Sequence, residues 1–225
     1  MYYSTKDNIK QLIIKKGRAV FWFTDDFSII GSIESVRKAL QCLVADGMLL
    51  RIAKGVYYYP KIDRELGLGV LYPSKEDTAK AIAKHHHLKI VPTGAFAMNA
   101  LGLTTQVQTV VTFLTNGRER SIDLGDGRYI QFLHSSVQKL FDYRSYVMIL
   151  VIQAMQELGE KAITVDVCTT FSRHLKNVAE REFVHDLTIA PVWAQELLKK
   201  LYEIQLQQSR GGFVRCRVSS FGGYF

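Results

Sequence analysis

The sequence predicts an α+β fold, in which an N-terminal winged helix-turn-helix is followed by a mixed α+β domain and a C-terminal helical segment. Two observations predict the first part: apolar residues recur at helical spacing after Ser32, and two short apolar runs joined by a glycine-containing turn follow at residues 48–59. The pattern changes to strand and hairpin signals after Ser74, and to long helical patterns after Tyr143. The expected parts are therefore residues 1–62, 63–143 and 144–208, with a flexible tail at 209–225.

The N-terminal part predicts helix, short strand, short helix, long helix and hairpin, in that order. Ser4 can cap the first helix, and Val20–Phe23 is aromatic and strand-like. Thr24 can begin the short helix, and Ser32 the long one. The three-residue turn at 53–55 ends in glycine, which suits a hairpin closed by one left-handed residue.

Lys61–Pro73 contains two glycines and ends in proline, so we expect an irregular connector there. The next part predicts two helices, at 74–84 and 93–101, and four strands, at 89–91, 109–114, 120–124 and 129–133. Asn116-Gly117 and Gly125-Asp126-Gly127 are hairpin signals between the last three strands. The C-terminal part predicts helices at 145–158, 165–174, 178–187 and 191–207.

Positive charge is concentrated at the two ends of the chain. The formal net charge is +8, and residues 1–62 hold ten Lys and Arg against five Asp and Glu. Residues 63–160 and 161–208 are balanced, whereas residues 209–225 add three arginines. An excess at one end is expected of a protein that contacts a polyanion there.

The chain gives no sign of export or of membrane insertion. No run approaches the ~18 apolar residues of a membrane helix, and the first residues lack an apolar signal core. The chain has three cysteines, an odd number, and they lie far apart, so they predict neither a disulfide framework nor a zinc site. We therefore expect a cytoplasmic protein that does not contact membranes.

Six residues of the N-terminal part are candidates for contact with double-stranded DNA. They are Ser32, Ser35, Arg37, Lys38, Arg51 and Lys54. Hydroxyls at a helix start can donate to phosphates or base edges, and a guanidinium can fork onto guanine or phosphate. The residues in the hairpin would contact the flanking phosphates or the minor groove. The alternative is that the serine only caps the helix and that the cations form a solvated face.

No residue cluster predicts catalysis, a metal site or a cofactor. His85-His86-His87 lies at a helix end where three consecutive side chains point in different directions, so a solvated terminus is expected. Gly31-Ser32 is followed by no Asp-x-Asp pair that could hold Mg²⁺. Cys168 and His174 do not share a helix face. We therefore expect a protein that is not an enzyme.

Two runs, SVRKALQCLVADGMLLRIAKGVYYYPK and KIVPTGAFAMNALGLTTQVQTVVTFLTNG, resemble the AbiEi-like antitoxins of type IV toxin–antitoxin systems. The likeness spans about Met1–Val151, and the second run is its more specific part. It implies an N-terminal domain that represses its own operon and a C-terminal domain that neutralises a toxin, usually a nucleotidyltransferase-like protein. Since two copies commonly read one site, the operator is expected to be an inverted repeat.

Three other functions stay open at this point. The chain could be a stand-alone winged-helix transcription regulator whose C-terminal domain senses a ligand or a protein. It could be an interaction module whose winged helix binds protein. An enzyme would require a titratable group with a perturbed pKa in a cleft, and the sequence does not indicate such a group.

Overall fold

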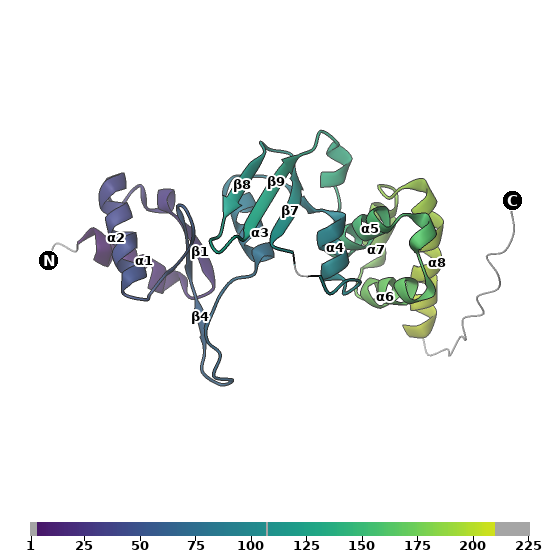
Figure 1. Ribbon diagram of the computed structural model, residues 1–225, viewed down its shortest axis with the longest axis horizontal. Helices are drawn as coiled ribbons and strands as arrows, with labels where there is room; N and C mark the ends of the chain where they lie inside the picture. Colours follow the sequence, from purple (N-terminus) through teal and green to yellow (C-terminus); the bar gives the residue numbers. More distant parts are fainter. Residues whose placement is uncertain (1–3, 107, 210–225) are drawn as a thin grey trace, which may run out of the picture. The chain divides into compact units, whose positions relative to one another are not determined.

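The computed structural model, which describes residues 4–106 and 108–209, is a mixed α+β protein (Figure 1). Its contacts group into two compact units. Of the described residues, the first contains those through Ile90 and the segment Gln108–Ser135, and the second contains the others. The boundaries expected near residues 62 and 143 stay predictions. Beyond Ser209, the expected flexible tail lies outside the described residues.

The N-terminal segment of the first unit has the predicted order of elements. They are α1 (Thr5–Lys16), β1 (Val20–Phe23), the 3-10 helix η1 (Thr24–Phe27), α2 (Ile33–Ala45), β2 (Leu50–Ala53) and β3 (Val56–Tyr59). Ser4 and Ser32 cap the two α-helices through their side chains, as predicted. The three strands form an antiparallel sheet in the order β1-β3-β2, so the C-terminal strand of the hairpin is central.

The core of this segment lies between α1, α2, η1 and the sheet. Its most deeply buried large side chains, which are at most 1% exposed, are Ile9, Ile13, Phe27, Val36, Leu40, Leu43 and Leu49. Full burial of each such side chain contributes about 1.5–3 kcal/mol before the entropy cost of folding. Ile33 does not join this core, although its spacing predicted that it would. It begins the first turn of α2 and is 59% exposed.

The β2–β3 turn is shorter than predicted. Ala53 pairs with Val56, so the turn contains only Lys54 and Gly55. Gly55 adopts a φ of +77°, the left-handed conformation that the glycine predicted. The ladder is irregular between Arg51 and Ala53, and this shift explains why the loop is two residues long and not three.

The expected irregular connector is instead a second hairpin. β4 (Lys61–Asp63) pairs antiparallel with β5 (Gly69–Leu71), and we call Lys61–Tyr72 the arm. Its turn uses Gly67 at a φ of +70°, and the Asp63 carboxylate accepts a hydrogen bond from the Leu66 amide at 2.9 Å. Gly67, which signalled a loop, therefore lies in the turn at residues 64–68 that joins the two short strands.

A helix and a four-stranded sheet follow, and all of their residues except Val91 and Pro92 belong to the first unit. The elements are α3 (Lys75–His85), β6 (Ile90–Pro92), β7 (Val110–Thr115), β8 (Arg120–Asp123) and β9 (Tyr129–His134). The strand order is β6-β7-β9-β8, with β9 parallel to β7 and antiparallel to β8. The hairpin predicted at residues 125–127 is confirmed, since β8 and β9 pair around it.

The hairpin predicted at Asn116-Gly117 is wrong, because β9 lies between β7 and β8. Both residues instead contact the segment that precedes β6, at the other edge of the sheet. The Asn116 side chain accepts a hydrogen bond from the Lys89 amide at 2.9 Å, and a Cβ at Gly117 would collide with Leu88. The Asn-Gly pair thus contacts the residues before β6 and does not close a turn between its own neighbouring strands.

The second unit is helical. Its helices are α4 (Gly94–Ala100), η2 (Gln138–Phe141), α5 (Tyr146–Leu158), η3 (Glu160–Ala162), α6 (Val165–Leu175), α7 (Glu180–Leu187) and α8 (Val192–Ser209). Gly94 lets α4 approach α5 closely, because a Cβ there would lie 2.8 Å from the carbonyl oxygen of Gln153. The fully buried Asp186 carboxylate accepts hydrogen bonds from the amides of Arg144 and Ser145, at 2.9 and 2.8 Å, which ties α7 to the start of α5. Across the described ranges, no helix has the length and apolar content that a membrane crossing requires.

Candidate nucleic-acid interface

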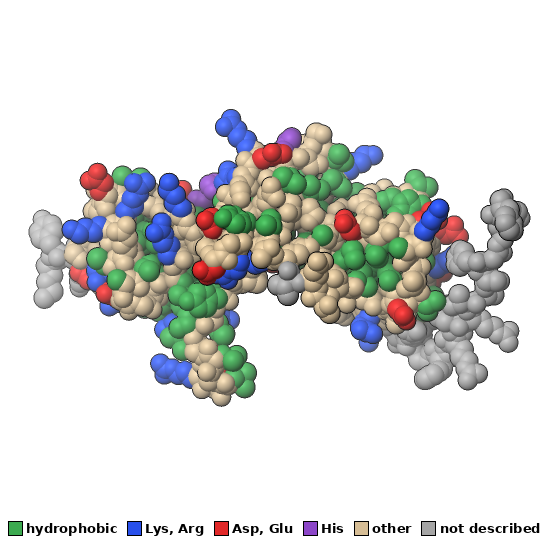
Figure 2. Space-filling view, in the orientation of Figure 1, with side chains coloured by type: hydrophobic (Ala, Val, Ile, Leu, Met, Phe, Trp, Pro, Cys, Tyr) green, Lys and Arg blue, Asp and Glu red, His purple; other side chains and the backbone are tan. Residues whose placement is uncertain are grey.

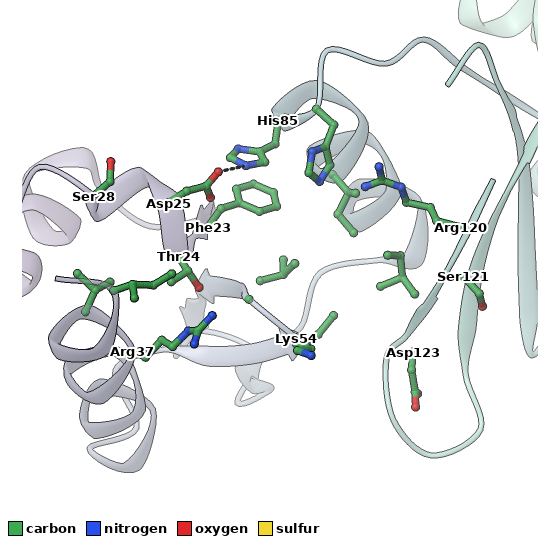
Figure 3. Close-up of a pocket in the computed structure, with 18 of the residues that line it drawn as sticks. Phe23, Thr24, Asp25, Ser28, Arg37, Lys54, His85, Arg120, Ser121 and Asp123 are labelled. Carbon is green, nitrogen blue, oxygen red and sulfur yellow. Dashed lines mark hydrogen bonds and ion pairs between the residues drawn. The ribbon is translucent and has the colours of Figure 1, made fainter. Parts of the chain in front are cut away.

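A hollow of about 750 Å³ opens in the first unit between α2, the β2–β3 turn, the end of α3 and β8 (Figure 3). Apolar side chains form much of its wall, among them Ile33, Val36, Ile82 and Ile122. The exposed Ile33 thus has a place at the surface of this hollow. Its size falls within the range of about 300–1,000 Å³ that is common for ligand sites.

Three cationic side chains from three separate elements line this hollow. They are Arg37 from α2, Lys54 from the β2–β3 turn and Arg120 from β8, and Arg37 and Arg120 reach into it from opposite sides (Figure 3). Arg37 and Lys54 are exposed, and Arg120 is half-buried. Within the described part of the chain, none of the three forms a hydrogen bond or an ion pair. Their charges are therefore available to an anion from outside.

Another part of the rim of the hollow is formed by a contact between η1 and α3. His85 Nε2 lies 3.0 Å from Asp25 Oδ2, and the imidazole stacks on the Phe23 ring at a centroid distance of 3.7 Å. His85 is therefore not the solvated terminus that was predicted, whereas His86 and His87 are exposed. The imidazole of His86 is nevertheless partly desolvated, which lowers its pKa, and the nearby Arg120 guanidinium acts in the same direction.

The two serines predicted to contact DNA lie together at the start of α2. Ser32 Oγ accepts a hydrogen bond from the Ser35 amide at 3.3 Å, and Ser35 Oγ lies 2.9 Å from both Ser32 Oγ and the Ser32 carbonyl oxygen. Both hydroxyls thus complete the helix cap. The capping role was one of the two interpretations, and it leaves the exposed Ser32 hydroxyl within reach of a further partner.

Lys38 and Arg51 do not join Arg37 and Lys54 in the hollow. Lys38 is exposed on the next position of α2, about 100° around the helix from Arg37. Arg51 is exposed on β2, opposite Tyr57 of β3. Lys and Arg side chains gather over this N-terminal part in the surface view (Figure 2). The structure thus brings two of the four predicted cations to one site and leaves two on the surrounding surface.

Sequence reasoning did not assign Arg120, Asp25 or His85 to this site. The sequence gives no signal for it, because these residues come from β8, η1 and α3 and meet only through the packing of the first unit. The site can bind anions through guanidinium and ammonium groups. Among the residues that the structure describes, no group of three or more His, Cys, Asp or Glu side chains could hold a metal ion.

The sequence pattern of a family of unknown function, DUF6088, matches residues 8–186. The chain belongs to this family. The matched range of the DUF6088 chain begins within α1 and ends within α7, so it includes all three cations of the hollow and most of both units. No curated protein matches the chain.

Proposed function

We propose that this chain is a cytoplasmic antitoxin that represses its own operon through an N-terminal winged helix bound to double-stranded operator DNA. In this proposal α2 enters the major groove and the β2–β3 hairpin is the wing that contacts flanking phosphates. The chain also neutralises a nucleotidyltransferase-like toxin, either by binding it or by opposing its effect. The operator is an inverted repeat.

The order of the N-terminal elements supports the winged helix. Helix, strand, short helix, long helix and hairpin follow one another within Thr5–Tyr59, and the first strand pairs with the hairpin. This sheet leaves the exposed side of α2 free of other elements of the same segment, since Val36, Leu40 and Leu43 face the core. A helix in this position can enter a groove about 12 Å wide.

The observation that carries the proposal is the convergence of Arg37 and Lys54. One comes from the expected recognition helix and the other from the tip of the expected wing, yet both line the same hollow and neither has an anionic partner among the described residues. Two elements that offer unpaired cations to one space fit a polyanion that spans both. Arg120 extends the same surface to β8.

The antitoxin role rests on the resemblance to AbiEi-like antitoxins and not on any single contact. Its two runs fall within the residues matched by the family, and the second run covers all of α4 and β7. The residues that would face the toxin are not assigned. A stand-alone regulator without a toxin is therefore the alternative that the experiments must separate.

DNA binding is tested with the full chain and the duplex upstream of its own gene. A scrambled duplex of the same length and composition is the control. We expect the upstream duplex to bind at least about 10³-fold more tightly, as specific sites commonly do relative to non-specific ones. Equal affinity for the two duplexes would contradict the role as a repressor, and no binding to either would remove the DNA-binding proposal.

The antitoxin role is tested by co-expression with the gene next to its own. We expect the neighbouring protein to arrest growth and the full chain to restore it. The Arg37→Ala variant should restore growth as well, because neutralisation does not require operator binding. A harmless neighbour, or arrest that the full chain does not relieve, would leave the stand-alone regulator as the better function.

A further inference from the structure

The hollow between α2, the β2–β3 turn, α3 and β8 has mostly apolar walls, which contact with phosphates alone does not require. Its large apolar side chains are Phe23, Ile33, Val36, Val56, Ile82 and Ile122. Ile33 is 59% exposed at the start of α2, so folding of the chain leaves this isoleucine open to an outside partner. Phosphates bind charged and polar groups and gain nothing from an apolar wall. These walls therefore indicate a ligand that has an apolar body of its own.

The hollow has the size and composition of a site for a small molecule. Its volume of about 750 Å³ suits an organic ligand, since such sites commonly measure about 300–1,000 Å³. They bury most of the ligand against apolar side chains and orient it with a few polar or charged groups. The lining residues fall within 23–56, 82–86 and 120–123, all in the first unit, so the site does not depend on the second unit.

Positive charges exceed negative charges among the side chains that line the hollow. Arg37, Lys54 and Arg120 contribute three positive charges. Asp25 and Asp123 contribute two negative charges, so with neutral histidines the surplus is three minus two, or +1. A ligand with one anionic group matches this surplus. A small anion that carries several charges would be repelled by the two carboxylates, and this repulsion is stronger in a partly enclosed space than in water.

The two carboxylates of the hollow have partners, whereas its three cations do not. Asp25 Oδ2 lies 3.0 Å from His85 Nε2, and Asp123 Oδ1 accepts a hydrogen bond from the Gly125 amide at 2.7 Å. Within residues 4–106 and 108–209, no hydrogen bond or ion pair engages the cationic groups. Arg120 is the half-buried member of the three, and a guanidinium that is partly withdrawn from water binds an anion more strongly than an exposed one.

We propose that the hollow binds a small organic anion, which has a compact apolar body and one carboxylate or sulfonate group. The anionic group binds the Arg120 guanidinium, and Arg37, which reaches in from the opposite side, adds positive potential (Figure 3). The body packs against the apolar wall, of which Ile33 is the most accessible part. Binding of this ligand does not depend on whether the chain binds DNA.

A bound anion also affects the proposed repressor. Arg37 and Lys54 line the hollow and are among the cations proposed to contact operator DNA. An anion in the hollow would reduce the positive potential that these side chains offer to phosphates, so the ligand should weaken operator binding. This consequence rests on the proposed function, whereas the ligand site itself does not.

Ligand binding is tested with the full chain and the fluorescent probe 8-anilinonaphthalene-1-sulfonate, an aromatic body that carries one sulfonate. Its fluorescence rises when it leaves water, so a titration gives a dissociation constant, and we expect saturable binding. N-phenyl-1-naphthylamine has the same aromatic body without the sulfonate and should bind at least about tenfold more weakly. Inorganic phosphate is an anion without a body, and it should displace the probe only at concentrations at least about 100-fold above that of the probe.

Variants of the lining assign the probe to the hollow, since the exposed apolar side chains of the arm could bind it as well. Arg120→Ala should weaken probe binding about tenfold, because it removes the charged partner of the sulfonate. The matched control is Arg118→Ala, at an exposed arginine that does not line the hollow. This control should bind the probe as the unmodified chain does.

A second variant covers the case in which Arg120→Ala alters the fold, as judged by circular dichroism. Ile33→Ser removes apolar surface from the wall at a residue that the core does not need, and it should weaken probe binding about threefold or more. Ile29→Ser is its matched control, at a 98% exposed isoleucine outside the hollow, and should have no effect.

The ligand site is overturned by the absence of saturable probe binding, by equal affinity for the neutral analogue, or by lining variants that bind the probe as their controls do. Displacement by phosphate at the concentration of the probe would overturn it as well, because the site would then need no apolar body. Saturating probe should weaken binding of the upstream duplex about threefold or more in gel mobility shifts. Unchanged duplex affinity would overturn the predicted competition. A chain that binds the probe but no duplex would support the ligand site and contradict the proposed function.

Discussion

Arg37 and Lys38 are neighbours in the sequence, but only Arg37 lines the hollow. Replacing Arg37 by alanine removes a guanidinium whose N–H groups can donate hydrogen bonds to a base edge or to two phosphates. We expect operator binding by Arg37→Ala to weaken by about 1–3 kcal/mol, measured by fluorescence anisotropy. Arg181→Ala, an exposed arginine of α7, is the matched control and should bind as the unmodified chain does. Unchanged affinity for Arg37→Ala would show that Arg37 is not a DNA contact.

We expect the Tyr143 phenol to make the free energy of unfolding fall at alkaline pH. Burial, together with the nearby Asp186 carboxylate, raises the pKa of the Tyr143 phenol above its ordinary value of 10.0. The folded state then holds the phenol proton at a pH where the unfolded chain releases it, so stability is full below about pH 10 and falls as pH rises beyond it. Urea denaturation between pH 8 and 11 should show this decline, and Tyr143→Phe should make it shallower. An equal decline in both proteins would exclude Tyr143 as its source.

Single residues show where prediction from sequence succeeded and where it could not. The serine caps and the left-handed Gly55 follow from local chemistry and are confirmed. Arg120 could not be assigned to the hollow, because its place there depends on strands and helices distant in sequence.

At the scale of elements, two substitutions of Ser32 distinguish its role as the N-cap of α2 from a contact with DNA. Ser32→Ala removes the acceptor for the Ser35 amide and should destabilise the chain by about 1 kcal/mol in denaturant titrations. Ser32→Asp keeps a capping acceptor and should leave stability nearly unchanged. Its negative charge should nevertheless weaken DNA binding if the helix start lies against phosphates. Full DNA affinity for Ser32→Asp would restrict Ser32 to the capping role.

The helices were predicted from apolar spacing and caps, and their bounds agree with the structure within a few residues. The sheets were less predictable, because strand order depends on contacts between distant segments. Asn116-Gly117 has the composition of a hairpin turn, yet its contacts with Leu88 and Lys89 leave β9 to pair with β7. Lys61–Pro73 has the composition of a connector, yet three residues on each side of its turn suffice for a ladder.

At the scale of the whole molecule, the uneven charge predicts how DNA binding responds to salt. Three to five phosphate contacts per chain should give a slope of log affinity against log salt of about −3 to −4.5. Each contact releases counterions and adds about −0.9 to this slope. Anisotropy titrations at several NaCl concentrations measure this slope. The Lys54→Ala variant should lower its magnitude by about one contact. A slope near zero would show that the cationic N-terminal part does not bind phosphates.

The first unit is assembled from two stretches of sequence that lie on either side of an intervening segment. β7 and β9, which build the centre of its larger sheet, are translated only after the helix α4 that belongs to the other unit. A nascent chain therefore cannot finish one unit before it starts the next. The first unit can be completed only once Ser135 has been synthesised, and a gene fragment cut near residue 90 would encode an unfinished sheet.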